Sequence, residues 1–205
     1  MMRACENYQV KTMRFVLASA SPRRKELLKE LIQDFEIIPA VGEENCHGLS
    51  PRKLVKALAT QKATEVANRL ECKGKIVLGS DTVVALGNAV LGKPKDEEDA
   101  KRMLRSLSGR AHYVYTGICF VYPTASGRKT IAKVGKTKVY FNSLSEEQIS
   151  DYVASGSPMD KAGAYGIQDG ELVKKIRGSF SCVVGLPVEL CKKTLKKVLK
   201  EVGND

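Results

Sequence analysis

The sequence has few of the residues that build metal clusters and no stretch that could cross a membrane. It contains two histidines, and its six cysteines include no C-x-x-C pair, so a zinc site is not expected. Reduced and mostly buried thiols are the expected state of these cysteines, which points to the cytosol. No apolar run approaches the length that spans a bilayer, and the run at residues 15–20 is better explained as a buried strand than as a secretory signal.

Low-complexity tracts and internal repeats are also absent, which excludes a disordered or fibrous protein. The chain has 205 residues, of which 43% are hydrophobic and 28% charged, so it can bury a core without disulfides or a structural metal. Residues 1–12 show no periodicity and are expected to form a loose tail. We predict one domain over residues 13–205.

Acidic residues are fewer than basic ones: 23 Asp and Glu stand against 34 Lys and Arg, which gives a formal net charge of +11. Such an excess attracts phosphate groups, whether of a nucleotide, a nucleic acid or a membrane surface. Part of it lies in an expected C-terminal helix, on Lys192, Lys193, Lys196, Lys197 and Lys200. No aromatic residue is interleaved with these lysines for base stacking, so we interpret them as a solvated helix face and do not expect a nucleic-acid partner.

The hydrophobic pattern predicts strands and helices that intermix along the chain. Apolar runs predict strands at residues 15–18, 35–39, 76–86, 89–91, 111–122 and 129–141, and two further apolar runs lie at 172–176 and 180–184. Capping signals predict helices after Ser21, Ser50, Asp96 and Ser145, and a final helix from Pro187. Because strands and helices do not alternate strictly, we predict an α/β fold with a mixed β-sheet and flanking helices, not a doubly wound parallel sheet.

A loop at the end of the first predicted strand has the chemistry of a phosphate-binding site. Ser19 and Ser21 precede Arg23 and Arg24, and Pro22 opens a helix whose N-terminal N–H groups point outward. Backbone amides, a helix dipole and planar guanidinium groups can together bind phosphate. The alternative is that Ser21 only caps the helix while both arginines lie in solvent.

Asp81 interrupts the most apolar predicted strand, where an unpaired carboxylate would be costly to bury. We therefore expect Asp81 to face a cleft, where it could bind Mg²⁺ and take a proton from an attacking water. The alternative is a structural aspartate satisfied by a nearby lysine or turn amide. Lys93, held before Pro94 at the far end of the following hairpin, could reach a phosphate.

The segment at residues 160–168 combines small residues with acidic, basic, aromatic and amide groups. Gln168 can both donate and accept hydrogen bonds, as reading the edge of a nucleobase requires. Taken alone, the segment is either a binding loop or a glycine-rich turn.

Six blocks, in this order along the chain, resemble the Maf family of nucleotide pyrophosphatases: residues 17–24, 79–84, 91–94, 107–110, 160–168 and 184–187. The resemblance implies two lobes around a central cleft, similar to the inosine triphosphate pyrophosphatase architecture, and commonly a homodimer. It also implies hydrolysis of nucleoside triphosphates to the monophosphate and pyrophosphate, with a divalent cation, Mg²⁺ or Mn²⁺, as cofactor.

The same resemblance implies roles for individual residues. Asp81 matches the family's proton acceptor, and the phosphate-handling positions are Ser19, Arg24, Lys62 and Lys93. Asp81 and an acidic pair, Asp-Glu in the family, would bind the metal. Residues 42–44 are Gly-Glu-Glu here, so we assign Glu43 to the metal, with Glu44 as the alternative.

Substrate choice follows from three further positions. Arg23, Thr82 and Gln168 resemble the family type that acts on dTTP and UTP. Relatives that act on 7-methyl-GTP characteristically have a tryptophan near the position of Arg23, and this chain has no tryptophan. The glycine that usually follows the position of Gln168 is Asp169 here, so the wall of the nucleobase pocket departs from the family pattern.

Two other functions remain open at this point: a pyrophosphatase of the 7-methyl-GTP type, and a basic nucleic-acid-binding regulator without catalysis. Asp81 argues against the regulator, because a protein that only binds phosphates has little use for a carboxylate within the binding cleft. The expected partners are therefore a nucleoside triphosphate and a second copy of the chain, in the cytoplasm and away from membranes.

Overall fold

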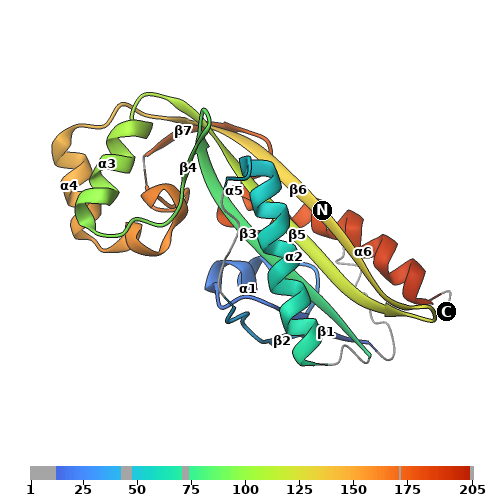
Figure 1. The fold of residues 1–205 in the computed structure, drawn as a ribbon. Helices are drawn as coiled ribbons and strands as arrows, with labels where there is room; N and C mark the ends of the chain where they lie inside the picture. The colour runs from blue at the N-terminus through green and yellow to red at the C-terminus, as the bar shows by residue number, and fades with distance from the viewer. Residues whose placement is uncertain (1–12, 43–47, 71–73, 171, 204–205) are drawn as a thin grey trace.

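A computed structural model describes residues 13–42, 48–70, 74–170 and 172–203, so the predicted tail at residues 1–12 lies outside the described chain. One seven-stranded sheet runs through the molecule in the order β2-β1-β3-β5-β6-β7, with β4 paired to β3 (Figure 1). The strands are β1 Arg14–Leu17, β2 Glu36–Ile37, β3 Lys75–Leu86, β4 Ala89–Leu91, β5 Ala111–Thr124, β6 Gly127–Phe141 and β7 Val173–Arg177.

Strand directions confirm the predicted mixed sheet. β1 runs parallel to β2 and to β3. β3 is antiparallel to β4 and β5, β5 to β6, and β6 to β7. The sheet therefore combines a crossover part at the N-terminal side with a long antiparallel hairpin, β5–β6, that extends into both lobes.

The helices begin close to the predicted capping signals. They are α1 Pro22–Lys29, α2 Pro51–Arg69, α3 Glu97–Leu107, α4 Glu146–Ala154, α5 Phe180–Val184 and α6 Val188–Gly203, with short 3₁₀ turns η1 Ser157–Asp160 and η2 Ala162–Ala164. Ser21, Asp96 and Ser145 cap their helices through side-chain hydrogen bonds, as predicted. Ser50 holds the N-cap position of α2 without a side-chain cap bond, so the prediction of the same cap chemistry there is wrong.

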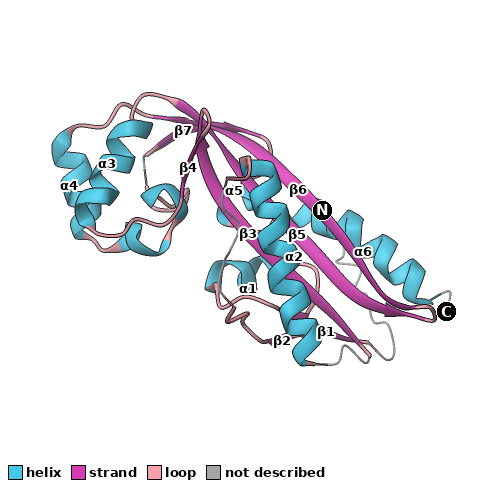
Figure 2. Ribbon diagram, in the orientation of Figure 1, coloured by secondary structure: helices cyan, strands magenta, loops and turns pink. Residues whose placement is uncertain are grey.

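Buried side chains divide the molecule into two lobes. In the larger lobe, Val77 packs with α2 on one face of the sheet, and Leu78 packs with α1 and α6 on the other. Adjacent strand residues point to opposite faces, so the helices cover both sides. In the smaller lobe, Leu104 of α3 and Ile149 of α4 pack with Val139 of β6. Figure 2 shows α3 and α4 beside one end of the long strands, apart from α2 and α6.

Two glycines let α2 lie against the sheet. A Cβ at Gly79 would come within 2.4 Å of the Ala59 carbonyl oxygen, and a Cβ at Gly117 within 2.1 Å of the Val55 carbonyl oxygen. Both separations are far below van der Waals contact, so any side chain at either position would push the helix outward. The close approach also sets the height of Lys62, on α2, above β3.

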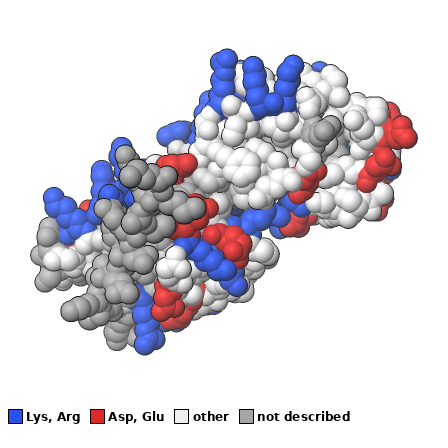
Figure 3. All heavy atoms as spheres, turned by 180° about the vertical axis from the view of Figure 1, so that it is seen from behind, with Lys and Arg blue, Asp and Glu red and all other residues white. Residues whose placement is uncertain are grey.

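The lysines of α6 and the described cysteines have the surroundings that the sequence predicted. Lysines of α6 are exposed while Leu195 and Val198 are buried, as a solvated helix face requires. Cys119, Cys182 and Cys191 are free and buried. Among the described residues, no helix combines the length and the apolar character that a bilayer crossing requires. Seen from behind, Lys and Arg side chains stand along the upper edge of the molecule (Figure 3).

Candidate active site

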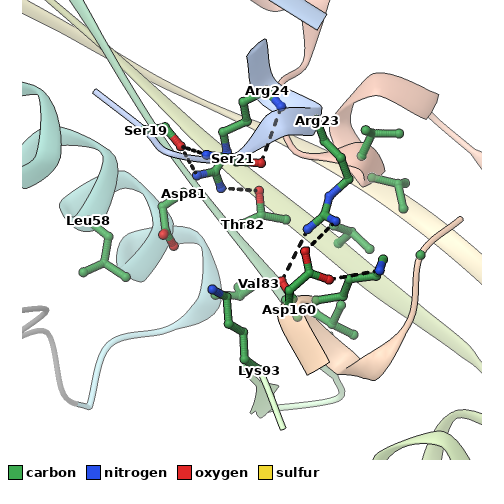
Figure 4. A pocket seen from close by; sticks show the side chains of 18 of the residues that line it. Ser19, Ser21, Arg23, Arg24, Leu58, Asp81, Thr82, Val83, Lys93 and Asp160 are labelled. Atoms are coloured by element: carbon green, nitrogen blue, oxygen red, sulfur yellow. Dashed lines mark hydrogen bonds and ion pairs between the residues drawn. The ribbon is translucent and has the colours of Figure 1, made fainter. Parts of the chain in front are cut away.

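A cavity of about 790 Å³ lies between the two lobes. Its lining contains every described residue that the sequence assigned to catalysis or substrate binding: Ser19, Arg23, Arg24, Lys62, Asp81, Thr82, Lys93 and Gln168. Figure 4 labels Ser19, Arg23, Arg24, Asp81, Thr82 and Lys93 and shows most of these side chains directed toward one space, although they come from both lobes. Glu43 and Glu44, assigned to the metal, lie outside the described residues.

Arg24 is fixed in the cavity wall by three acceptors. Its Nη1 donates to Ser19 Oγ at 3.1 Å, and its Nε donates to the Gly185 carbonyl oxygen at 3.0 Å. Its Nη2 donates to Thr82 Oγ1 at 3.3 Å. Ser19 is itself 8% exposed and accepts a hydrogen bond from the Ser21 amide. For Arg24, this arrangement contradicts the alternative that the arginine lies in solvent.

Thr82 is partly buried and belongs to a chain of hydroxyl groups behind Arg24. The hydroxyls of Thr82 and Thr116 lie 3.0 Å apart, and Thr116 donates to the Cys182 carbonyl oxygen at 2.7 Å. Ser80 donates to the carbonyl oxygens of Gly117 and Gly185. The Gly185 carbonyl thus serves both Ser80 and Arg24, which holds the turn after α5 against β3 and α1.

Asp81 lies on the face of β3 that α2 covers, and Figure 4 shows it near Ser19 and Arg24. Lys62 Nζ donates to Asp81 Oδ1 at 2.6 Å, and the side chains are 19% and 9% exposed respectively. The short contact explains how a carboxylate is accommodated in an apolar strand. A partner lysine was the structural alternative for Asp81, but both members of this pair line the cavity, so the pair is available to a ligand.

Lys93 reaches the cavity from the smaller lobe. It follows β4, and the preceding Gly92 carbonyl accepts a hydrogen bond from the Gly163 amide at 2.8 Å. That bond ties the Lys93 segment to η2. Among the described residues Lys93 has no ion pair or side-chain hydrogen bond, and Figure 4 shows it directed toward the side where Asp81 lies. Its ammonium group is therefore positioned to meet a charged ligand.

Arg23 joins the two lobes across the mouth of the cavity. Its Nη1 lies 2.9 Å from Asp160 Oδ2, and its Nη2 donates to the Asp160 carbonyl oxygen at 3.3 Å. Burial raises the pKa of Asp160, but hydrogen bonds from Lys161 and Arg23 outweigh it, and the net pKa is lowered. Asp160 is therefore ionised at neutral pH and holds the guanidinium group in place.

Asp169 anchors the loop that carries Gln168. Its Oδ2 accepts hydrogen bonds from Tyr152 Oη at 2.8 Å and from Ser157 Oγ at 2.7 Å, and Lys161 Nζ lies 3.4 Å away. Burial raises the pKa of Asp169, but these donors lower it on balance. A Cβ at Gly166 would come within 2.5 Å of the same oxygen, so the anchor also needs that glycine. Asp169, which stands where the family usually has a glycine, therefore attaches this loop to Tyr152, Ser157 and Lys161.

A model of the family described as Maf-like protein matches residues 14–198. The chain belongs to the Maf family. A dTTP/UTP pyrophosphatase of Thermococcus kodakarensis is 47% identical over 192 residues, which cover 93% of this chain and 97% of that protein. A Homo sapiens protein, named probable bifunctional dTTP/UTP pyrophosphatase/methyltransferase protein, is 45% identical over 197 residues, which cover 89% of this chain and 32% of that protein.

Solved structures resemble this Maf protein in fold at much lower sequence identity. The Staphylococcus aureus Ham1 protein matches with a TM-score of 0.52 and 17% sequence identity, covering 90% of this chain and 98% of that chain. At this identity the likeness shows the fold alone. It supports the mixed α/β architecture that the sequence predicted.

A buried pair of side chains, His112 and Tyr165, lies behind the cavity wall of this Maf protein, and only Tyr165 lines the cavity. His112 Nε2 and Tyr165 Oη lie 2.7 Å apart. Burial lowers the pKa of His112 from 6.5 to about 4, so its ring is neutral at physiological pH. This pair could not be predicted from the sequence, because a lone histidine in a strand does not reveal its partner.

The described part of the cavity offers few ligands for a metal ion. Within the described ranges, no three His, Cys, Asp or Glu side chains are grouped to hold a metal ion. The carboxylates in the described lining are Asp81 and Asp160, and Asp160 is bound to Arg23. Mg²⁺ commonly uses one or two protein carboxylates together with water and substrate phosphates, so Asp81 fits a cation that binds with its nucleotide.

Sequence reasoning missed the residues that position others. Asp160 was part of a noted segment but had no assigned partner, and Gly185 was noted without a role. Thr116 was not singled out at all, because a threonine that alternates with apolar residues is common in strands. The signal that could have found Thr116 is its register with Thr82, which only a known strand pairing supplies.

Proposed function

We propose that this Maf protein hydrolyses nucleoside triphosphates, with dTTP and UTP as preferred substrates, to the nucleoside monophosphate and pyrophosphate. One observation carries the proposal: Asp81 lies in a cation-lined cavity of a chain 47% identical to a dTTP/UTP pyrophosphatase. The described lining has five basic side chains, Arg23, Arg24, Lys62, Lys93 and Lys161, against the two carboxylates of Asp81 and Asp160. Such an excess of positive charge suits a triphosphate.

Asp81 is proposed as the base for the attacking water. The water oxygen forms a bond to the α-phosphorus, the bond from that phosphorus to the bridging oxygen breaks, and pyrophosphate leaves with the electron pair. Asp81 takes the proton from the water. Lys62, at 2.6 Å, holds the carboxylate in place before substrate arrives and is close enough to transfer its contact to a phosphate oxygen.

The remaining lining residues divide into two roles. Ser19, Arg24 and Lys93 are proposed to bind phosphate oxygens, since Arg24 and Lys93 are cations and Ser19 lies beside the N-terminus of α1. Arg23 and Gln168 are proposed to read the nucleobase at the mouth of the cavity. Thr82 contributes to substrate choice through its contact with Arg24.

A divalent cation, Mg²⁺ or Mn²⁺, is proposed to bind at Asp81 and at Glu43 or Glu44. When bound, such a cation would neutralise phosphate charge and polarise the bond to phosphorus. The protein's own contribution is to present Asp81 beside Lys62 at the end of the cavity where the phosphates are expected.

Two further assignments belong to the same proposal. We expect a homodimer in solution, and we expect the protein to act in the cytosol. The three described cysteines are free and buried, which suits a reducing compartment. Sedimentation equilibrium measures the first expectation directly.

Pyrophosphate release from a panel of nucleoside triphosphates tests the function. Wild-type protein with Mg²⁺ or Mn²⁺ should release pyrophosphate from dTTP and UTP faster than from ATP, GTP or 7-methyl-GTP, and EDTA should stop the release. In ¹⁸O-water the label should appear in the monophosphate, since water attacks the α-phosphorus. Label in the pyrophosphate, or no metal-dependent release from any nucleotide, would reject the proposal.

A further inference from the structure

Three tyrosines and four basic residues share one face of the sheet, outside the cavity. They are Tyr113 and Tyr115 of β5, Lys136, Lys138 and Tyr140 of β6, and Lys175 and Arg177 of β7. The register pairs Tyr113 with Lys138, and Lys138 in turn with Arg177. Directly paired strand residues point to the same side, so the set forms one surface, which we call the tyrosine–lysine face.

Each ring of this face has a cation near it. Lys136 Nζ lies 3.8 Å from the centre of the Tyr113 ring and 5.4 Å from that of Tyr115. Lys175 Nζ lies 4.8 Å from the centre of the Tyr140 ring. Within the described chain, none of the four basic side chains forms an ion pair with a carboxylate. The face therefore has four positive charges that no described acidic residue neutralises.

The tyrosine–lysine face is not covered by the helix that packs on the same side. The N-terminal part of α2 contacts β5 where Val55 lies against Gly117. Tyr113 and Tyr115 precede Gly117 in β5 and lie beyond the N-terminal end of α2. Lys136, Lys175 and Arg177 are exposed, and the tyrosines are partly exposed. Figure 1 shows β7 above the upper end of α2, where β5 and β6 enter the smaller lobe.

We propose that the tyrosine–lysine face binds single-stranded nucleic acid. Four cations supply contacts to successive phosphates, and three rings supply platforms on which unpaired bases stack. Aromatic side chains on an open sheet face bind single strands in other nucleic-acid-binding domains through the same two interactions. Lysine–ring contacts at an exposed site are weak, so the ammonium groups can turn to phosphates while bases take their places on the rings.

Charge decides between this partner and a second copy of the chain. Two copies joined through the face would bring four uncompensated cations from each side together, which is unfavourable. The phosphates of a duplex could also contact the four cations, but its bases are paired and cannot stack on the tyrosine rings. The lysines of α6 have no aromatic residue among them and are not expected to bind nucleic acid, whereas this face has both basic and aromatic side chains.

Fluorescence anisotropy of the full chain with a labelled oligodeoxyadenylate of about twelve nucleotides tests the proposal. A purine strand is used because the cavity is proposed to prefer pyrimidine nucleotides. Four phosphate contacts predict that the logarithm of the binding constant falls with the logarithm of salt concentration with a slope of about −3. Lys136→Gln, Lys138→Gln and Lys175→Gln together should reduce the slope to about −1 and weaken binding at least about tenfold.

Matched variants separate this face from charge in general. Lys192→Gln, Lys193→Gln and Lys197→Gln remove the same charge from α6 and should leave the affinity within about twofold. Tyr140→Leu keeps the charge and the apolar contact area but removes the ring, and it should weaken binding about tenfold. Thermal unfolding midpoints close to that of the wild type establish that the variants fold.

Four results would overturn the proposal. The first is an equal loss of binding in the α6 variant, and the second is a duplex of the same sequence that binds as tightly as the single strand. The third is displacement of the strand by excess UMP, which would locate it in the cavity. The fourth is a dimer in the wild type that becomes a monomer in the lysine variant of the face, which would make the face an interface between copies.

Discussion

Replacing Gly79 with alanine should push α2 away from β3 and separate Lys62 from Asp81. The new Cβ would lie 2.4 Å from the Ala59 carbonyl oxygen and 2.7 Å from the Ala63 amide nitrogen. Both atoms belong to helix backbone, which cannot rotate aside as a side chain can, so α2 has to shift outward by roughly 1 Å to restore ordinary contact. Lys62 lies between these two helix residues, and its 2.6 Å contact with Asp81 would lengthen beyond a hydrogen bond.

The magnitude follows from the overpacking and from the displacement. Inserting one methyl group into a packed site costs about 1–3 kcal/mol, and contact with backbone favours the upper end, so the unfolding midpoint should fall by about 6–12 °C. A displacement of roughly 1 Å in a catalytic group lowers kcat/KM about a hundredfold. Both quantities are measured by calorimetry and by pyrophosphate release.

Gly203→Ala is the matched control for Gly79→Ala, because no atom lies within 4 Å of a Cβ at Gly203, in the last turn of α6. It should leave both stability and activity unchanged. A Gly79→Ala variant that melts within about 1 °C of the wild type and keeps its full kcat/KM would show that α2 does not depend on the glycine.

Three other substitutions probe the site from different sides. Asp160→Asn should raise KM for dTTP and UTP about fivefold with little change in kcat, because it releases Arg23 and not the reacting groups, and steady-state kinetics checks this. Asp169→Gly should likewise raise KM by freeing the loop of Gln168, and a KM equal to that of the wild type would show that Asp169 is not an anchor. His112 has a pKa lowered from 6.5 to about 4 by burial, so its contribution to stability is complete above pH 6.5 and is lost as the pH falls toward 4. That loss amounts to about 3 kcal/mol in urea unfolding, and it should be absent in His112→Gln.

Local chemistry made much of the fold predictable. Capping by Ser21, Asp96 and Ser145 depends on residues within one helical turn, and all three predictions are confirmed. The apolar run at residues 180–184 had no assigned structure, and it forms α5, a helix of five residues capped by Ser179. A run that short satisfies the pattern of a strand and of a buried helix equally, so its neighbours in the fold decide.

Contacts between residues far apart in the sequence could not be predicted as well. The sequence located Asp81 by its conflict with an apolar strand, and it located Arg23 by its helix-start position. It could not pair Asp81 with Lys62 or Arg23 with Asp160, because the latter two are 137 residues apart and meet only through the packing of two lobes. The tyrosine–lysine face could not be predicted either, because its residues come from three strands and share a surface only through the strand pairing.

Turnover of dTTP by Asp81→Asn, beside Asp151→Asn as a control on the exposed side of α4, tests the central claim most directly. If Asp81 takes the proton from the attacking water, Asp81→Asn should release pyrophosphate at least about a hundredfold more slowly than the wild type, while circular dichroism shows an intact fold. Asp151→Asn should retain wild-type turnover. Pyrophosphate release by Asp81→Asn at a rate close to that of the control would contradict the account.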